Sequence, residues 1–247
     1  MKNHLTKVFF GLNNSVEFIK GLQHAIHQTR NGGIFTGDNL FTYNKNLSFL
    51  DDEKLMSSFK KHATSPVEQG ILWRIALVVW GARNGLRLEG DFVECACYKG
   101  TTARIACDIL DFAAFTNKHY YLYDLFDHDP SQPHHAMPEH SDQLFNHVKN
   151  RFADVPNAVI TQGKVPDVLH DVAPDKIAFL HLDLNNADAE IGALELLFDR
   201  MVPGSILVLD DYGWLAYRAQ KKAEDPWFDK RGYRVMELPT GQGILIK

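Results

Sequence analysis

From residue 90 onward, the chain alternates between short apolar runs and longer segments in which apolar side chains recur at helical spacing. The apolar runs of strand length occupy residues 91–97, 119–126, 158–163, 177–184 and 205–211. Between the last two runs, Ile191, Leu194 and Phe198 share one face of a helix. Strands separated by helices pair in parallel, because the crossover returns the chain to the starting edge of the sheet. The alternation therefore predicts a parallel sheet wrapped by helices.

The two ends of the chain depart from this alternation. Residues 233–239 and 243–247 are short apolar runs close enough to form a hairpin, so we expect an antiparallel C-terminal edge on the parallel sheet. The predicted fold class is α/β, with a doubly wound Rossmann-like sheet. Residues 1–65 show no such alternation, and we interpret them as an N-terminal extension, either a lid or an oligomer contact. Residues 66–247 then form the main domain.

Two helices are expected outside the strand runs. Residues 65–82 are apolar at helical spacing and form the first helix of the main domain. A second helix is predicted over residues 141–153, where Ser141 is a residue type that caps helix N-termini well. Both helices are expected to pack one face on the sheet.

Composition excludes several classes of partner. The 26 Lys and Arg residues are outnumbered by 31 Asp and Glu, and no basic block is present that could track a phosphate backbone. The longest apolar run, residues 71–82, is too short for a membrane span and is broken by Arg74. The N-terminus lacks the apolar core of a signal peptide, and three cysteines are too few for a disulfide framework. We therefore expect a cytoplasmic protein that binds neither nucleic acid nor membrane, with Cys95 and Cys97 reduced and packed in the core.

Polar residues follow every predicted parallel strand. In chain order they are Gly100 and Thr101, Asp124, Gln162 and Gly163, Asp183 with Asn185 and Asn186, and Asp210 with Asp211. The carboxyl ends of parallel strands meet at one edge of the sheet, where ligands bind. Two adjacent acids cannot both enter a core without a large desolvation cost. The sequence therefore predicts one polar crevice whose acids bind a positively charged group.

The loop after the first strand discriminates between two adenosine cofactors. A dinucleotide requires G-x-G-x-x-G so that backbone N–H groups can approach the pyrophosphate. The corresponding segment here, ECACYKGT, has a single glycine. S-adenosylmethionine has no pyrophosphate and does not need that pattern, and Asp124 at the end of the second strand can accept both hydroxyls of its ribose. The sequence therefore favours S-adenosylmethionine over a nicotinamide cofactor and its oxidoreductase chemistry.

Three segments resemble a known family. GDFVECACYKGTTARIA, YLYDLFD and FLHLDLNNADAEIGALELLFDRMVPGSILVLDDYG are similar to the macrocin O-methyltransferases, class I enzymes that use S-adenosylmethionine. The resemblance covers residues 65–247 and implies magnesium-dependent methylation of a hydroxyl on a small molecule, typically a sugar of a natural product. The chain departs from the family where the second aspartate of Asp-x-Asp is Asn185, and where Ala187, Ala189 and Glu190 replace a tyrosine and a Ser-Thr pair. These differences concern the choice of acceptor.

The resemblance also implies roles for individual residues. The donor-binding set, made up of the matching motifs and their neighbours, is Glu94, Cys95, Tyr98, Gly100, Thr101, Thr102, Asp124, Gln162, Gly163 and Asp183. The positions that match the metal-binding carboxylates are Asp183, Asp210 and Asp211. Carboxylate oxygens suit a hard divalent cation such as Mg²⁺. Asp183, or else His181 on the same strand face, is predicted to accept the proton of the acceptor hydroxyl.

Three alternatives stay open from the sequence. A catechol-type O-methyltransferase shares the donor, metal and fold but takes an aromatic diol, and a non-catalytic binding protein can keep the same fold. Residues 127–140, which include His134 and His135, contain enough histidines and acids for a metal cluster. Their Pro-rich, irregular spacing is more typical of a loop, and we expect a mobile loop over the acceptor site. A homo-oligomer is also compatible with the N-terminal extension.

Overall fold

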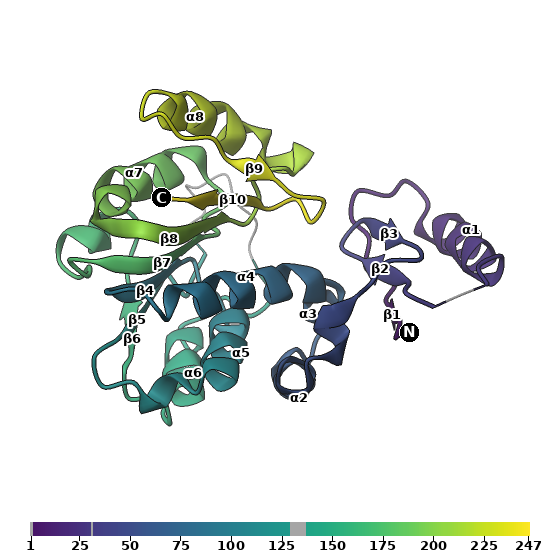
Figure 1. Ribbon diagram of the computed structural model, residues 1–247, viewed down its shortest axis with the longest axis horizontal. Coiled ribbons are helices and arrows are strands. Elements are labelled where there is room, and N and C mark those ends of the chain that lie inside the picture. Colours follow the sequence, from purple (N-terminus) through teal and green to yellow (C-terminus); the bar gives the residue numbers. More distant parts are fainter. Residues whose placement is uncertain (1, 31, 129–136) are drawn as a thin grey trace. The chain divides into compact units, whose positions relative to one another are not determined.

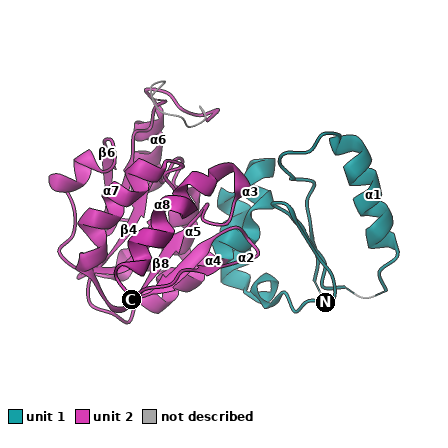
Figure 2. Cartoon of the chain, turned by 90° about the horizontal axis from the view of Figure 1, so that it is seen from above, with its two compact units in different colours: residues 1–76 teal, residues 77–247 magenta. Residues whose placement is uncertain are grey.

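The computed structural model describes residues 2–30, 32–128 and 137–247. The chain divides into two compact units, Met1–Ala76 and Leu77–Lys247, which Figure 2 colours separately. The unit boundary falls 11 residues after the one expected from the sequence pattern, position 76 against 65. His134 and His135 of the expected loop lie outside the described residues. No helix in the described ranges is both long and apolar enough to cross a membrane.

The larger unit is built on a seven-stranded sheet with the order β6-β5-β4-β7-β8-β10-β9 (Figure 1). Its strands are β4 (Asp91–Cys95), β5 (Tyr120–Asp124), β6 (Ala158–Gln162), β7 (Ile177–Leu182), β8 (Met201–Leu209), β9 (Met236–Glu237) and β10 (Gly243–Ile246). The first five pair in parallel, and β10 is antiparallel to both β8 and β9. The predicted doubly wound sheet with an antiparallel C-terminal edge is confirmed.

The order of the strands reverses beside β4. The chain builds outward from β4 through β5 to β6, then crosses back to place β7 on the other side of β4 and β8 beyond it. Loops that leave β4 and β7 at their carboxyl ends run in opposite directions and leave a crevice between them, which is where ligands bind in open α/β sheets. Strands β4 and β7 therefore position the candidate site.

Helices cover both faces of the sheet (Figure 1). Those of the main domain are α4 (Leu72–Gly85), which begins in the smaller unit, α5 (Thr101–Leu110), α6 (Leu144–Arg151), α7 (Ala187–Leu197) and α8 (Arg218–Asp229). Because side chains alternate across a strand, Val93 and Leu180 face the buried cluster that includes Leu194 of α7 and Phe228 of α8. Phe179, next to Leu180, points to the opposite face. There it meets α4.

Gly81 allows α4 to approach the sheet closely. A Cβ at Gly81 would lie 2.7 Å from Cε2 of the buried Phe179 ring and 3.4 Å from Ile206. We expect Gly81→Ala to lower the free energy of unfolding by about 1–3 kcal/mol, because overpacking a filled core displaces rings and backbone. Thermal and urea unfolding measure the change. The matched control is Gly21→Ala in the middle of α1 (Ser15–His27), where nothing lies within 4 Å of the added methyl. That substitution should be neutral or stabilising by up to about 1 kcal/mol, and equal effects of the two would contradict the close packing.

Two helix boundaries differ from the sequence prediction. Helix α6 begins at Leu144 rather than at Ser141, because the Ser141 hydroxyl donates to the Glu139 carbonyl oxygen instead of capping a helical N–H. The helix expected over residues 65–82 is divided at Ile71 into α3 (Pro66–Gly70) and α4. A capping box between Ser65 and Glu68 begins α3.

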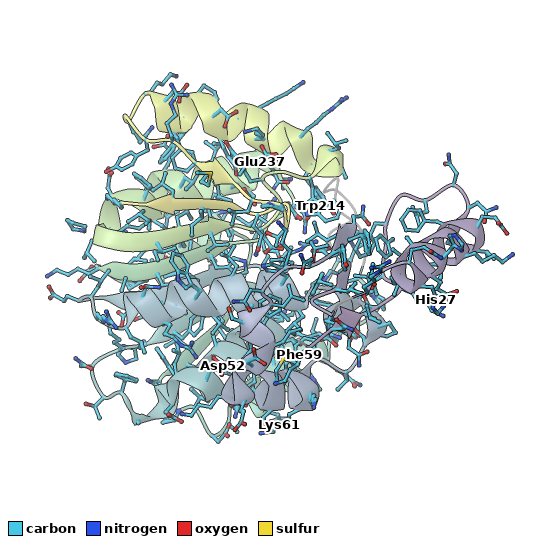
Figure 3. The ribbon with its side chains drawn as sticks, turned by 45° about the vertical axis from the view of Figure 1, so that its right-hand side comes forward. His27, Asp52, Phe59, Lys61, Trp214 and Glu237 are labelled. Atoms are coloured by element: carbon cyan, nitrogen blue, oxygen red, sulfur yellow. The ribbon has the colours of Figure 1, made fainter. Side chains whose placement is uncertain are left out.

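The smaller unit contains a three-stranded sheet that the sequence pattern did not reveal. Its strands β1 (His4–Leu5), β2 (Phe35–Gly37) and β3 (Leu40–Thr42) are only two or three residues long, and β1 pairs with β2 in parallel. Helix α2 (Glu53–His62) is capped by Asp52, buries Phe59 and exposes Lys61, the three residues labelled on it in Figure 3. Strands this short show no alternation in sequence, so the unit could only be expected to be irregular.

Candidate functional site

A pocket opens at the carboxyl ends of β4, β5, β6 and β7. Its cavity volume is about 190 Å³, and it is open to solvent on one side. It is lined by Ala96, Tyr98, Asp124, Leu125, Asp127, Met137, His140, Gly163, Lys164, Val165, Asp183, Leu184, Asn185, Asn186 and Ala189. The pocket lies at the reversal of strand order, where the sequence predicted a polar crevice.

The loop between β4 and α5 has an unusual backbone. Ala96, Tyr98 and Gly100 all have positive φ angles, of 67°, 48° and 67°. Left-handed conformations cost a residue with a Cβ about 1–2 kcal/mol, and such strain is concentrated at functional sites. Only Gly100 shows the usual sequence signal, and a Cβ there would lie 2.7 Å from the Phe152 ring. Ala96 and Tyr98, two of the residues with positive φ, lie in the pocket wall.

Asp124 is held rigidly at the end of β5. Its Oδ2 accepts a hydrogen bond from the backbone N–H of Tyr98 at 2.7 Å, and its Oδ1 accepts from the N–H of Phe126 at 2.7 Å. The residue is 8% exposed and lines the pocket. Two backbone donors fix the directions in which this carboxylate presents its lone pairs, and four such sites are available on an ionised carboxylate. This geometry suits the role of a ribose acceptor.

The predicted donor-binding residues divide into two groups. Tyr98, Asp124, Gly163 and Asp183 line the pocket, whereas Glu94, Cys95, Gly100, Thr101, Thr102 and Gln162 are not part of its lining. Glu94 and Cys95 are still inside strand β4 and are buried. The Thr101 hydroxyl accepts from Arg151, and the Gln162 amide donates to the Leu125 carbonyl oxygen. Most of the other lining residues follow a strand end by one to three positions, whereas Met137, His140, Asn186 and Ala189 lie further along the chain.

Three carboxylates converge beside the pocket. Asp183 follows β7, Asp210 and Asp211 follow β8, and one oxygen from each lies within 4.8 Å of the others. The register of β7 and β8 explains this, because Leu182 pairs with Leu209 and the next residues of both strands leave the sheet together. Like charges at this separation repel, which a bound cation offsets. An all-oxygen donor set fits a hard divalent cation such as Mg²⁺.

His181 lies behind this cluster and is buried. Its Nε2 is 3.4 Å from Asp210 Oδ1, and its Nδ1 is 3.4 Å from Glu94 Oε2. Burial alone would lower the pKa of His181, but hydrogen bonding to Asp210 and Glu94 outweighs burial and raises this pKa well above its ordinary value. Gln242 donates to Asp210 Oδ1 at 2.7 Å, and the Tyr120 hydroxyl donates to Glu94 Oε2 at 2.9 Å. His181 therefore contacts Asp210 from behind the cluster, and of the two predicted proton acceptors only Asp183 lines the pocket.

Residues 93–212, which contain both the pocket wall and the acid cluster, match the family model of a methyltransferase domain. The match covers slightly less than half of the chain. It supports the predicted enzyme class, an S-adenosylmethionine-dependent methyltransferase. The sequence matches no curated protein.

Solved structures of methyltransferases share the fold of this chain at low sequence identity. The O-methyltransferase NovP is 16% identical with a TM-score of 0.60, over 71% of this chain and 80% of its own. The apo TDP-rhamnose 3'-O-methyltransferase CalS11 is 13% identical with a TM-score of 0.58, over 97% and 96%. The O-methyltransferase TomG from Streptomyces achromogenes, determined with S-adenosylmethionine, is 12% identical with a TM-score of 0.51, over 79% and 90%. At these identities the likeness is one of fold.

The segment that follows Asp210 and Asp211 is anchored to helix α8. The hydroxyl of Tyr212, the residue after Asp211, hydrogen-bonds to Asp225 and accepts from Lys221 Nζ at 2.7 Å. Burial first, and then the hydrogen bond to Asp225, raise the pKa of Tyr212 to about 12. Trp214, labelled in Figure 3, ends this turn by donating its backbone N–H to the Asp211 carbonyl oxygen at 3.0 Å. The backbone that carries Asp210 and Asp211 is therefore fixed at both ends, by β8 and by α8.

Proposed function

We propose that the protein is a magnesium-dependent O-methyltransferase of the macrocin type, which transfers a methyl group from S-adenosylmethionine to a hydroxyl of a sugar or glycosylated natural product. The observation that carries the proposal is the convergence of Asp183, Asp210 and Asp211 within 4.8 Å beside a pocket that also contains Asp124. Asp183 belongs to both, since it lines the pocket and contributes to the cluster. Donor and metal would therefore meet at this residue.

When bound, S-adenosylmethionine supplies an electrophilic methyl carbon, and Mg²⁺ supplies a Lewis acid that lowers the pKa of a nearby hydroxyl. The carboxylate of Asp124, fixed by two backbone N–H groups, orients the ribose of the donor. Asp210 and Asp211 would hold the cation, and His181, whose Nε2 lies 3.4 Å from Asp210 Oδ1, helps to keep Asp210 in place. A carboxylate oxygen of Asp183 accepts the proton of the acceptor hydroxyl. Holding both reactants in line accounts for much of the rate in such a displacement.

The sugar acceptor is supported by a structural neighbour. CalS11, described as a TDP-rhamnose 3'-O-methyltransferase, aligns over 97% of this chain and 96% of its own. A catechol-type acceptor has weaker support, from a putative caffeoyl-CoA O-methyltransferase of Staphylococcus aureus with a TM-score of 0.53 and 11% identity. A binding protein without activity has no use for three clustered acids, which cost stability when nothing neutralises them.

An acceptor screen tests the proposal. Purified protein is incubated with isotopically labelled S-adenosylmethionine, Mg²⁺ and two panels, one of nucleotide sugars and glycosides and one of catechols. We expect label in the sugar panel alone, and no transfer in chelator, because the acid cluster needs its cation. Label confined to catechols would assign the catechol-type activity instead. Donor binding without transfer to either panel would favour the non-catalytic alternative.

A further inference from the structure

Two carboxyl groups, from Glu190 of α7 and Glu224 of α8, are buried together where these helices pack. They are 1% and 0% exposed, and hydrogen bonding between the two carboxyls is among the causes that shift the pKa of each. Gln220 Nε2 donates to Glu190 Oε1 at 2.6 Å. No N–H or hydroxyl group of the described residues reaches either oxygen of Glu224. A buried carboxylate without such donors is costly, so, among the described residues, a proton shared between the two carboxyls is the donor that remains for Glu224.

Neighbouring charges do not replace that proton. Burial first, then the hydrogen bond to Glu224, raise the pKa of Glu190 well above its ordinary value, and burial likewise raises the pKa of Glu224. The charged or titratable groups that face the pair from its own and adjacent elements are Lys221 and Asp225 of α8, Asp211 after β8 and Cys95 of β4. Of these groups only Lys221 is a cation. It lowers the pKa of Glu224, whereas Asp225 and Asp211 both raise it. Two carboxylates in contact cannot both ionise in such a setting.

The pair is connected to the pocket through the backbone. Leu184 donates its N–H to Glu190 Oε1 at 3.2 Å, and Leu184 directly follows Asp183. Asn186 caps α7 by accepting the N–H of Ala189 at 3.0 Å. The loop of residues 183–186 lines the pocket and is therefore held at one end by the helix cap and in its middle by Glu190. Glu190 is one of the positions at which this chain differs from the macrocin O-methyltransferases that it resembles.

We propose that Glu190 and Glu224 form a proton-sharing carboxyl pair that positions the pocket loop of residues 183–186, so that release of the shared proton to solvent loosens the donor site. The inference rests on the proposed function for its link to the donor, but the pair itself does not. Glu190 acts through the Leu184 N–H and is a positioning residue.

The sign of the pH effect follows from the raised pKa values. An unfolded chain titrates its glutamates near pH 4.3, roughly, whereas the folded pair keeps its proton to higher pH. Between these two points the folded state binds more protons than the unfolded state, so stability falls as pH rises and levels off above the folded pKa. The stabilisation of the folded state by the shared proton is therefore fully present at low pH and lost at high pH.

Matched glutamine variants test the pair. E190Q and E224Q each keep the hydrogen bonds, because an amide can donate to the remaining carboxylate and accept from its neighbours, but neither has a proton to share. We expect the Tm of the wild-type protein to fall by about 5 °C more than that of either variant between about pH 5 and about pH 9, measured in chelator. Equal slopes in all three proteins would overturn the pair. A Tm that rises with added sodium or potassium at fixed pH would assign an ion to the site and overturn it as well.

Donor binding tests the positioning role. The Kd of S-adenosylhomocysteine is measured by calorimetry at about pH 6 and about pH 9, and the ratio of the two values is compared among the three proteins. We expect the wild-type ratio to exceed the E190Q and E224Q ratios by about fivefold, a modest coupling between sites. Equal ratios combined with unequal Tm slopes would leave the pair structural and refute the positioning role. If no protein binds this ligand at either pH, the proposed function fails, and the Tm comparison alone decides the pair.

Discussion

Asp210→Asn is expected to reduce methyl transfer by about 10–100-fold at limiting magnesium, the range seen when the surroundings of a metal site lose one well-placed group. Asparagine keeps the shape of the side chain and can still accept from Gln242, which donates to Asp210 Oδ1 at 2.7 Å. It removes one of the charges that attract the cation. High magnesium should therefore recover part of the rate. Initial rates measured against magnesium concentration give the effect on metal and on turnover separately.

The specificity of this result depends on two controls. Affinity for S-adenosylhomocysteine should change little in Asp210→Asn, because Asp210 is not part of the pocket lining. Asp171→Asn, at an exposed acid outside the lining, removes the same charge and should retain the wild-type rate. EDTA should abolish activity of the wild-type enzyme and magnesium should restore it. Full activity in chelator would leave the three acids as structural groups.

Asp124→Ala is expected to weaken binding of S-adenosylmethionine and its product by about 1.5–3 kcal/mol for each ribose hydroxyl that the carboxylate accepts, roughly tenfold or more. The same change leaves the N–H groups of Tyr98 and Phe126 without the acceptor that now fixes them at 2.7 Å. Loss of this support should add to the effect, since both residues belong to loops at the strand end. Calorimetry with S-adenosylhomocysteine measures the affinity directly.

A conservative variant separates the loss of the ribose hydrogen bonds from the loss of support for the Tyr98 and Phe126 N–H groups. Asp124→Asn retains one acceptor oxygen and should lose less affinity than Asp124→Ala, whereas Asp171→Ala should bind as the wild-type protein does. Thermal unfolding without ligand shows whether each variant is folded, and the ligand-induced rise in Tm should shrink in the same order as the affinity. Wild-type affinity in folded Asp124→Ala protein would remove this residue from the donor site.

The central sheet could be predicted because parallel strands buried on both faces are continuous apolar runs. All five predicted runs overlap observed strands, although β8 begins earlier, at Met201. The sheet of the smaller unit could not be predicted, because His4 pairs with Phe35 across a segment that contains helix α1, and neither strand exceeds three residues. Helix caps were predicted less well, since the alternative partner of Ser141, the Glu139 carbonyl oxygen, is not visible in sequence.

The acids of the site could be predicted from strand ends, whereas their surroundings could not. Asp183 and Asp210 follow apolar strands, so their convergence needs only neighbouring strands in register. The left-handed backbone at Ala96 has no sequence signal, since glycine is the residue expected at positive φ. The raised pKa of His181 depends on Asp210 and on Glu94, which lies on the adjacent strand and pairs with His181 in register. Cross-strand pairs of this kind exist only once the sheet has formed.

The hydrogen bonds that hold Asp210 also set the order in which the site can be assembled. Asp210 Oδ1 is fixed by Gln242, which directly precedes the last strand of the sheet, β10. A growing chain that has emerged as far as Asp211 has all three carboxylates and His181, but not Gln242, the other group that contacts Asp210 Oδ1. If the three acids bind a cation as proposed, that binding would reach its full strength only after Gln242 and β10 have been added. Chains that end before Gln242 would lack one of the two side-chain contacts to Asp210 Oδ1 described above.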